Sequence, residues 1–480
     1  KKGQKGKPMI NVNSSVAFSN AIELPDLLSP HDYIRKVNLA SGMDENADPI
    51  MIPEVYANYK AGKSTNWLDL ITRTGVTSNH SASISGGSEK MNYYMTIGYT
   101  EQKGCLLGDN FWRPNGSLRL QSNITKWLEI GGEIAYIFRN YSGAKVGTAD
   151  MYYAIHTNPY GLVYRDNGQL NRYPNGQGLA SVNPLWTEGS HAYDHHDVYY
   201  TTIPRGHILI KCPWIEGLSF RINGSYTIER RDVNNFYHEG YYMPQNATDA
   251  DYTPSAVTKW LPLANGSTSN AVWDTWVWDN ILDYNHQFGK HFVDVTLVYT
   301  RDSKNYSYYN MTGSDFSLLG NTLLGYNGLT YAAIQKISSI SKTTHNDVGY
   351  LGRISYNYED TYHLDVSLRK DGSSVFGQNN KWGYFPAVGV AWTLSNEDFM
   401  HPLKAINYLK LKASWGRNGN QSLDPYSTLS KIALGQSGNY SITFGNPPEL
   451  AWGQRVRTIG NADLGWEQTE SYNYGFESGW

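Results

Sequence analysis

A dense group of imidazole and carboxylate side chains occupies residues 191–197 of this chain. Its members are His191, Asp194, His195, His196 and Asp197. Imidazole and carboxylate groups are common zinc ligands, but the spacing here matches no standard zinc arrangement. We therefore interpret the group as part of a solvated loop and predict no metal there.

A second candidate metal site begins at Asp44, which is followed by Asn46 and Asp48. This alternation is typical of the start of an EF-hand calcium loop. Such a loop needs glycine at its sixth position and glutamate at its twelfth, where this chain has Pro49 and Val55. We predict neither a metal nor another cofactor for the chain.

The sequence also lacks the common signatures of a catalytic centre. It contains no Gly-x-Ser-x-Gly elbow, no Walker loop, no His-Glu-x-x-His and no Cys-x-x-Cys. Neighbouring acids such as Asp249 and Asp251 occur in loops, but acid and base roles require a geometry that sequence alone does not supply. We predict that the protein is not an enzyme.

The elements that must position these side chains are strands. In residues 362–369 (YHLDVSLR) apolar and polar residues alternate, and a strand sends successive side chains to opposite faces. The pattern therefore predicts a sheet with one apolar and one polar face. Its recurrence predicts about fourteen strands. It recurs in residues 10–18, 118–124, 128–138, 218–228, 293–299, 350–358, 384–394, 409–415 and 472–476.

The links between the predicted strands are short at one end and long at the other. Short links cover residues 86–90, 124–127, 213–217, 288–291, 359–361 and 396–407. Long links cover residues 21–76, 141–195, 236–270, 306–336 and 418–466, with briefer ones at 103–114 and 371–381. A β-sandwich has more evenly spaced turns, whereas a transmembrane β-barrel has short periplasmic turns and long extracellular loops. The predicted fold class is an all-β, antiparallel transmembrane β-barrel.

Composition agrees with a barrel that has a wet lumen. Mean hydropathy is −0.51, and no apolar run reaches the roughly 18 residues of a spanning helix. Half of the strand residues of a barrel face its polar interior, so a low average is expected. Several aromatic rings stand beside the short links, where the membrane interface would be. These are Trp127, Trp214, Phe288, Phe292, Tyr358, Tyr362 and Tyr408.

Charge and cysteine content argue against a nucleic-acid-binding protein and against a fold held by disulfides. The chain has 40 Lys and Arg residues against 43 Asp and Glu residues, which leaves no basic footprint for a nucleic-acid partner. Cys105 and Cys212 are too few for a disulfide framework. The predicted topology places them at opposite ends of the sheet, too far apart to bridge.

The first long link carries helix signals. Ser29 offers an N-cap, Pro30 stands at the first helical position, Asp32 follows in the first turn and Gly42 is a stop, so a helix is predicted over 30–39. Two more short helices are predicted over 53–61 and 67–73. Long loops with ordered structure are usually functional.

Several short segments give the chain a family resemblance. They are residues 85–90 (SGGSEK), 369–374 (RKDGSS) running into 382–386 (WGYFP), 396–400 (NEDFM), and 409–416 (LKLKASWG) through 419–421 (GNQ). Residues 1–6 (KKGQKG) and 461–467 (NADLGWE) before 471–475 (SYNYG) complete the set. In this order and spacing they resemble SusC-type (SusC/RagA) TonB-dependent transporters of Bacteroidetes over nearly the whole chain.

The resemblance implies a location, an architecture and an activity. Such transporters are similar to a 22-stranded barrel of the outer membrane with a plugged lumen. Residues 1–7 would be the end of the plug domain or its linker, and residues 8–480 the N-terminal two thirds of the barrel, with the plug and the last strands missing. The implied activity is import of glycans or peptides across the outer membrane. A SusD-like lipoprotein would form the lid, and TonB would act through the missing N-terminal region.

For such a transporter the relevant chemistry is recognition. Sugar rings stack on flat aromatic side chains, and their hydroxyls need fixed polar partners. We predict that extracellular aromatic residues bind the substrate, namely Trp186, Tyr193, Tyr241, Tyr242 and Trp260. The alternative is that these rings pack within their own loops or against the lid.

Two other functions remain open. One is a TonB-dependent siderophore or cobalamin receptor, which would share the barrel. The other is a secreted β-rich glycan-binding protein or glycosidase, which would bury its apolar sheet faces. The barrel hypothesis instead places those faces in lipid and puts Arg221, Arg353, Asp365 and Lys410 on the opposite, lumenal side.

Overall fold

A computed structural model describes most of the chain. The described residues are 6–176, 181–242, 263–316, 322–400, 402, 406–434 and 441–479. Among them, no helix is both long and apolar enough to cross a membrane.

Fourteen strands form one antiparallel sheet, in the order β1-β2-β3-β4-β5-β6-β7-β8-β9-β10-β11-β12-β13-β18. The strands are β1 Gly6–Ser19, β2 Gly75–Gly87, β3 Met91–Lys103, β4 Asn110–Asn123, β5 Leu128–Asn140, β6 Tyr193–Lys211, β7 Leu218–Tyr237, β8 Asn265–Phe288, β9 His291–Ser314, β10 Ile334–Tyr358, β11 Tyr362–Ser373, β12 Trp382–Thr393, β13 Tyr408–Asn420 and β18 Glu467–Gly479. The expected all-β antiparallel sheet is confirmed. Within the described residues β1 and β18 do not pair, so the wall is open.

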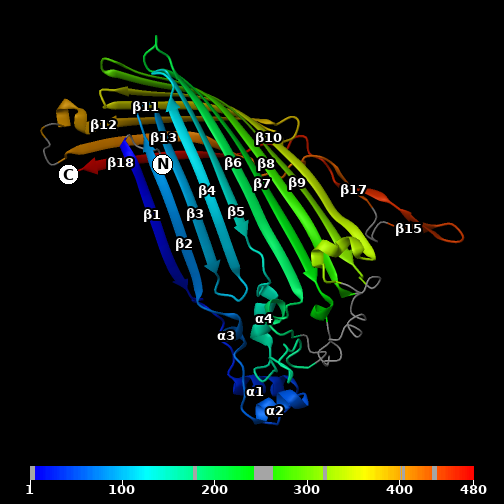
Figure 1. Cartoon of the computed structure of the whole chain (residues 1–480). Helices are drawn as coiled ribbons and strands as arrows, with labels where there is room; N and C mark the ends of the chain where they lie inside the picture. Colours follow the sequence, from blue (N-terminus) through cyan, green and yellow to red (C-terminus); the bar gives the residue numbers. More distant parts are fainter. Residues whose placement is uncertain are drawn as a thin grey trace.

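The expected asymmetry of the connections is also confirmed. Short turns join one set of strand ends, while the long links and their helices gather at the other, as Figure 1 shows. The helices at the long-link end are α1 Pro30–Ala40, α2 Pro53–Lys60, α3 Trp67–Ile71, α4 Thr148–His156 and α5 Trp186–Gly189, with the 3-10 helices η1 Glu239–Tyr242 and η4 Gly325–Tyr331. Two further 3-10 helices, η5 Leu394–Asn396 and η6 Asp398–Met400, lie in the connection between β12 and β13 at the short-turn end. The last long link carries two small hairpins, β14 Lys431–Leu434 with β17 Gln454–Thr458 and β15 Ser441–Phe444 with β16 Glu449–Trp452. We call the structure at the long-link end the loop layer.

The predicted cap of α1 is present. The backbone N–H of Asp32 donates to the Ser29 hydroxyl at 3.1 Å, and Pro30 opens the helix. Helices α2 and α3 lie where they were predicted and end one and two residues early. The starts of these helices were therefore predicted better than their ends. Pro53 opens α2 without a side-chain cap, whereas the Asn66 side chain caps α3 by accepting the Leu68 N–H.

The central strands are longer than predicted. Strand β9 continues to Ser314 and β10 begins at Ile334, so the connection between them is shorter than the expected link over 306–336. Likewise β8 begins at Asn265, inside the expected link over 236–270. These extensions carry polar and aromatic residues on both faces, so they lack the alternation on which the prediction depended.

The pairing register separates two faces of the sheet. On one face Leu364 pairs with Tyr356 and Val366 pairs with Ile354. The leucine and the valine are 38% and 43% exposed, although both belong to the most regular part of the sheet. On the other face Arg353 donates to Asp365 at 2.7 Å. Strand alternation places Arg221 and Lys410 on this same polar face, as predicted.

Two rows of aromatic rings bound the apolar face. One row lies toward the long-link end, where the Tyr350 ring is 5.3 Å from Tyr299 and 6.4 Å from Trp382. The other lies at the short turns, where the Tyr362 ring is 6.3 Å from both Tyr358 and Trp392. The rise along a tilted strand between the rows is roughly 20 Å, close to the height of a barrel's lipid-facing band. We call the exposed apolar residues between the two rows the apolar band.

The packed cores lie in the loop layer. Trp67, Leu68 and Ile71 of α3 pack with Val146, Ala154 and Leu185. Two further clusters occupy this layer, and they contain Ile34, Val55 and Tyr160, and Phe236, Ala264, Phe316, Leu329 and Ala332. The chain thus buries apolar side chains in its connections and exposes them on its sheet. In a globular β protein, by contrast, the apolar face of the sheet is buried in the core.

Candidate recognition site in the loop layer

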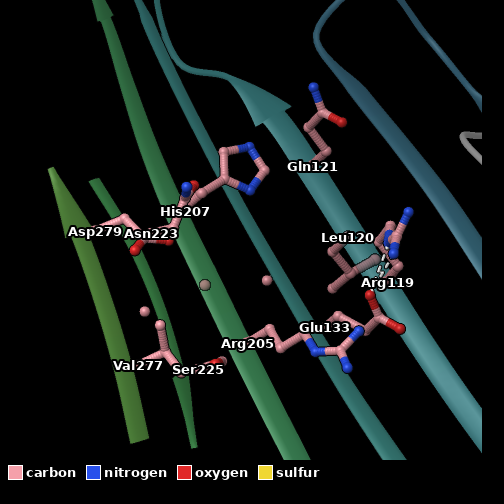
Figure 2. Close-up of a pocket in the computed structure, with 13 residues that line it drawn as sticks. Arg119, Leu120, Gln121, Glu133, Arg205, His207, Asn223, Ser225, Val277 and Asp279 are labelled. Carbon is pink, nitrogen blue, oxygen red and sulfur yellow. Dashed lines mark hydrogen bonds and ion pairs between the residues drawn. The ribbon is translucent and has the colours of Figure 1, made fainter. Parts of the chain in front are cut away.

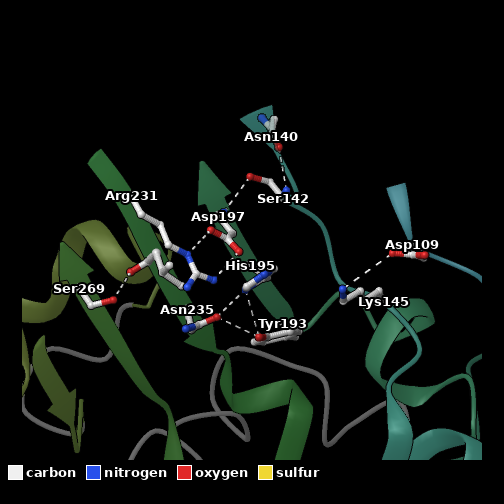
Figure 3. Close-up of polar contacts among 11 residues, drawn as sticks. Asp109, Asn140, Ser142, Lys145, Tyr193, His195, Asp197, Arg231, Asn235 and Ser269 are labelled. Atoms are coloured by element: carbon white, nitrogen blue, oxygen red, sulfur yellow. Dashed lines mark hydrogen bonds and ion pairs between the residues drawn. The ribbon is translucent and has the colours of Figure 1, made fainter. Parts of the chain in front are cut away.

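Two tyrosines stack where β6 begins and β7 ends. Tyr193 and Tyr237 are register partners, their ring centroids are 4.5 Å apart, and the rings are nearly parallel at 18°. The Tyr193 hydroxyl donates to Asn235 Oδ1 at 2.9 Å, and the His195 ring nitrogen Nδ1 lies 2.6 Å from the same oxygen. The strand register fixes this arrangement, which Figure 3 shows for Tyr193, His195 and Asn235.

A tryptophan and an arginine extend the aromatic cluster. The Trp186 indole N–H donates to the Tyr241 carbonyl at 3.1 Å, and Arg172 Nη1 donates to the same carbonyl at 2.6 Å. The Arg172 guanidinium lies 5.6 Å from the Trp186 ring and 5.4 Å from the Tyr241 ring, within cation–π range. The Tyr241 ring also meets Tyr237 edge-on at 5.0 Å. We call Arg172, Trp186, Tyr193, Tyr237 and Tyr241 the aromatic cluster.

The structure brings together three of the five residues predicted to bind substrate. Trp186, Tyr193 and Tyr241 belong to the aromatic cluster, and Tyr242 is the last residue of η1. Trp260 lies outside the described residues. Trp186 is only 4% exposed, so its ring packs within the loop layer, whereas Tyr193 and Tyr241 are partly open.

Sequence reasoning missed Arg172 and Tyr237. Tyr237 could have been predicted, because counting residues along both strands from the short turn at 212–217 pairs it with Tyr193. Arg172 had no comparable signal, since it reaches the cluster through the fold of the link between β5 and β6.

Most of the histidine and aspartate group lies on β6, so its assignment to a solvated loop was wrong. Both carboxylate oxygens of Asp197 accept hydrogen bonds from Arg231, at 2.9 and 2.8 Å, and Asp194 lies 2.7 Å from His238 Nε2 (Figure 3 shows the Asp197 pair). Strand pairing gives these residues partners that a loop would not. The described residues contain no group of three or more ligands placed to hold a metal.

The Asp44–Asp48 segment engages protein partners. Asp48 accepts from Lys60 at 2.8 Å and from the Tyr56 hydroxyl at 3.0 Å. The hydrogen bond from Lys60 is the main reason that the pKa of Asp48 is lowered. This carboxylate therefore anchors the segment to α2.

A buried carboxylate connects α4 to α5 beside the cluster. Asp150 Oδ2 accepts the Gly147 N–H at 2.7 Å, and Oδ1 accepts the Thr187 hydroxyl at 3.1 Å. Burial raises the pKa of Asp150, because removing a carboxylate from water disfavours its charged form. Burial likewise raises the pKa of Tyr241.

Two hollows lie outside the aromatic cluster, and no residue of the cluster lines either of them. One, of about 710 Å³, lies between the first long link and α4 and is lined by Tyr33, Lys36, Trp67 and His156, among others. The second, of about 350 Å³, is on the polar face of the sheet (Figure 2). It contains the Arg119–Glu133 ion pair, and Arg205, Asn223 and Asp279 lie around it.

Both cysteines are free, as predicted. Cys105 follows β3 at the long-link end, and its Sγ lies 3.3 Å from the Ser19 carbonyl oxygen. Cys212 begins the short turn after β6.

Curated relatives match the chain along its whole length. TonB-dependent receptor P39 of Formosa agariphila is 25% identical over 480 residues, which cover 99% of this chain and 42% of the relative. TonB-dependent receptor SusC of Bacteroides thetaiotaomicron is 23% identical over 503 residues, which cover 100% of this chain and 46% of the relative. The chain therefore spans less than half the length of these relatives. The resemblance predicted from the short segments is confirmed.

Solved structures give the same fold. The RagAB peptide transporter matches with a TM-score of 0.76 and 20% identity, covering 100% of this chain and 53% of the matched chain. An open-open state of the RagAB peptide importer matches with a TM-score of 0.73 and 21% identity, over 100% and 53%. No family model matches the chain.

Proposed function

From its homology to SusC-type TonB-dependent transporters, we propose that this chain forms part of the wall of an outer-membrane importer. The substrate class is glycans or peptides, and the chain's role is transport rather than catalysis. SusC is a relative, and the matched RagAB structures are described as a peptide transporter and a peptide importer.

The apolar band carries this proposal. Leu364, Val366 and Leu368 are 38–52% exposed in the middle of the sheet, and aromatic rows lie above and below them. Water would make such a surface costly, whereas lipid would cover it. The polar face would then line the lumen. A secreted β-rich protein would instead cover the band with a second layer, and the described residues place none over it.

The domain assignment stays a proposal. We propose that residues 1–7 are the end of a plug domain or its linker and that residues 8–480 form the N-terminal two thirds of a barrel that further strands would close. TonB would act through the plug, which provides energy coupling that the wall itself does not supply.

The loop layer is proposed to face a SusD-like lipoprotein and to contact the substrate. Tyr193 and Tyr241 offer partly open rings, with Arg172 and Asn235 as polar neighbours. Trp186 would support Tyr241 from below through its indole hydrogen bond. Tyr242 and Trp260 are retained as proposed contacts from the same link.

Purification of the full-length protein from outer membranes tests the importer class. We expect a SusD-like lipoprotein to accompany the barrel in mild detergent. A barrel that purifies without the lipoprotein and binds a ferric siderophore or a corrinoid would contradict the proposal and favour the alternative receptor.

Substitutions in the cluster test the site. We expect Tyr193→Ala and Tyr241→Ala to weaken uptake of the cognate glycan or peptide at least tenfold, while Tyr331→Ala, which removes a more exposed ring in η4, leaves uptake unchanged. Equal uptake by all three variants, at equal surface amounts, would show that the cluster does not contact the substrate.

A further inference from the structure

Three glycines form a row across adjacent strands on the apolar face. Gly132 of β5 pairs with Gly206 of β6, which pairs with Gly224 of β7. Isoleucines stand two residues away on each strand, at Ile130, Ile208 and Ile222. Because alternate residues share a face, the three glycines interrupt the apolar band.

The backbone does not require glycine at these positions. An added Cβ at Gly132 or Gly206 would meet nothing closer than 3.7 Å, and at Gly224 it would lie 3.6 Å from the Trp278 ring. None of the three has a positive φ. On the opposite face, in contrast, a Cβ at Gly131 would lie 2.1 Å from the His207 ring. The consequence of the row is therefore open space above the strands.

That space is a groove of about 590 Å³ with apolar walls. Ile130, Ile208 and Ile222 line it on one side, and Pro204, Tyr226, Trp276 and Trp278 line it on the other. Its length, three strand spacings, is roughly 14 Å, and its depth is about that of one side chain. A protein partner would need a contact area of roughly 800 Å², so a groove this narrow fits a single hydrocarbon chain better.

The groove rises toward the long-link end. The distance from the short turns increases along the groove. Gly132 lies four residues from the short-turn end of β5 at Leu128. Trp278 and its register partner Arg301 lie ten residues from the short-turn ends of β8 and β9, at Phe288 and His291. The short turns lie on one side of the membrane, so the groove climbs from the middle of the band to its outer border. Arg301 is exposed there, with its guanidinium 5.7 Å from the Trp276 ring.

We propose that this groove binds one acyl chain of a phosphate-bearing lipid of the outer leaflet, and that Arg301 binds the phosphate. A lipid chain enters the bilayer from its headgroup, which is the path from Arg301 down the glycine row. Arginine pairs well with phosphate oxygens, and the neighbouring tryptophans suit the interface. The inference depends on the membrane placement proposed above and goes beyond the import function.

Native mass spectrometry of the full-length protein, extracted from outer membranes in mild detergent, tests the proposal. We expect the wild type to retain a phosphate-bearing lipid. Gly206→Leu, which fills the groove, should reduce retention at least fivefold, and Arg301→Gln should reduce it with selective loss of the phosphate-bearing species. Gly116→Leu is the matched control, because Gly116 lies on the same face outside the groove and an added Cβ there meets nothing closer than 3.6 Å.

Each other outcome has a definite meaning. Equal retention by wild type, Gly206→Leu and Arg301→Gln overturns the proposal, and so does a wild type that carries no lipid although it fractionates with the outer membrane. If Gly206→Leu keeps its lipid but no longer co-purifies with a second protein, the groove is a protein contact and the lipid proposal is overturned. A wild type absent from the outer membrane overturns the membrane placement itself, and the groove proposal with it.

Discussion

Asp197 and Arg231 form a bidentate ion pair that connects β6 to β7 near their long-link ends. The Asp197 side chain is mostly buried, and Arg231 also lies 5.0 Å from the Tyr199 ring. Two parallel N–H to oxygen contacts make this geometry more specific than a single surface contact.

The first prediction concerns this pair. We expect Asp197→Ala and Arg231→Ala each to destabilise the folded protein, with a coupling free energy of roughly 2 kcal/mol, because either change leaves a half-buried charge unpaired. A double-mutant cycle from urea unfolding of the full-length protein in lipid measures it. Additive single effects would show that the two residues act independently.

The second prediction concerns a turn. Gly217 has φ +84°, and an added Cβ would lie 1.7 Å from the Asn285 carbonyl oxygen. We expect Gly217→Ala to lower the folded fraction of the protein severely, since backbone atoms must move to accommodate the added Cβ. Gly289→Ala is the control, because Gly289 has φ +58° and open space, so only the conformational cost of about 1 kcal/mol applies. Band shift on unheated gels compares the two, and similar losses would contradict the explanation.

The third prediction tests which face meets lipid. Val366 belongs to the apolar band, and Ser367 is its neighbour on the polar face. We expect Val366→Arg to cost about 2–4 kcal/mol of folding free energy in a bilayer, and Ser367→Arg to cost much less. Refolding into vesicles measures both. The opposite order would place the polar face toward lipid.

The fourth prediction concerns pH. Asp150 has a raised pKa in the folded protein because of burial, so it holds its proton to a higher pH there than in the unfolded chain. Its contribution to stability is thus largest at low pH and falls as the pH rises through the interval from its ordinary value, about 4, to the raised pKa. We expect protection of the link over 141–192 from proteolysis to fall over that interval.

Asp150→Asn should remove this pH dependence. Asp166→Asn changes an exposed carboxylate in the same link and should leave it unchanged. If Asp150→Asn follows the wild-type profile, a different group is responsible.

The alternation of apolar and polar residues predicted the sheet well, because the two faces of a strand receive alternate side chains. Over residues 362–369 apolar side chains such as Leu364 and Val366 lie on one face and polar ones such as Asp365 on the other, and β11 extends over this run. Beyond the aromatic row at the long-link end, β9 and β10 no longer alternate between apolar and polar residues. Those parts of the two strands could therefore not be recognised from the same pattern.

The loop layer was predictable only where local signals exist. Ser29 caps α1 through its own hydroxyl, and that helix was found. Helix α4 was missed: its N-cap is Gly147, which has no side chain, and only Asp150 in the first turn bonds back to the Gly147 N–H. In the candidate site the stacking of Tyr193 on Tyr237 follows from strand register, whereas the contact of Trp186 with Tyr241 depends on how two separate links fold together.

The loop layer's separate cores bear on how this protein could be redesigned. Trp67, Leu68 and Ile71 anchor their link to other links, so that layer has its own source of cohesion. The strand pairs below it keep their register through backbone hydrogen bonds and short turns. An engineer could therefore graft a foreign set of links onto this scaffold as a block, provided that the block brings its own buried tryptophan and leucine contacts.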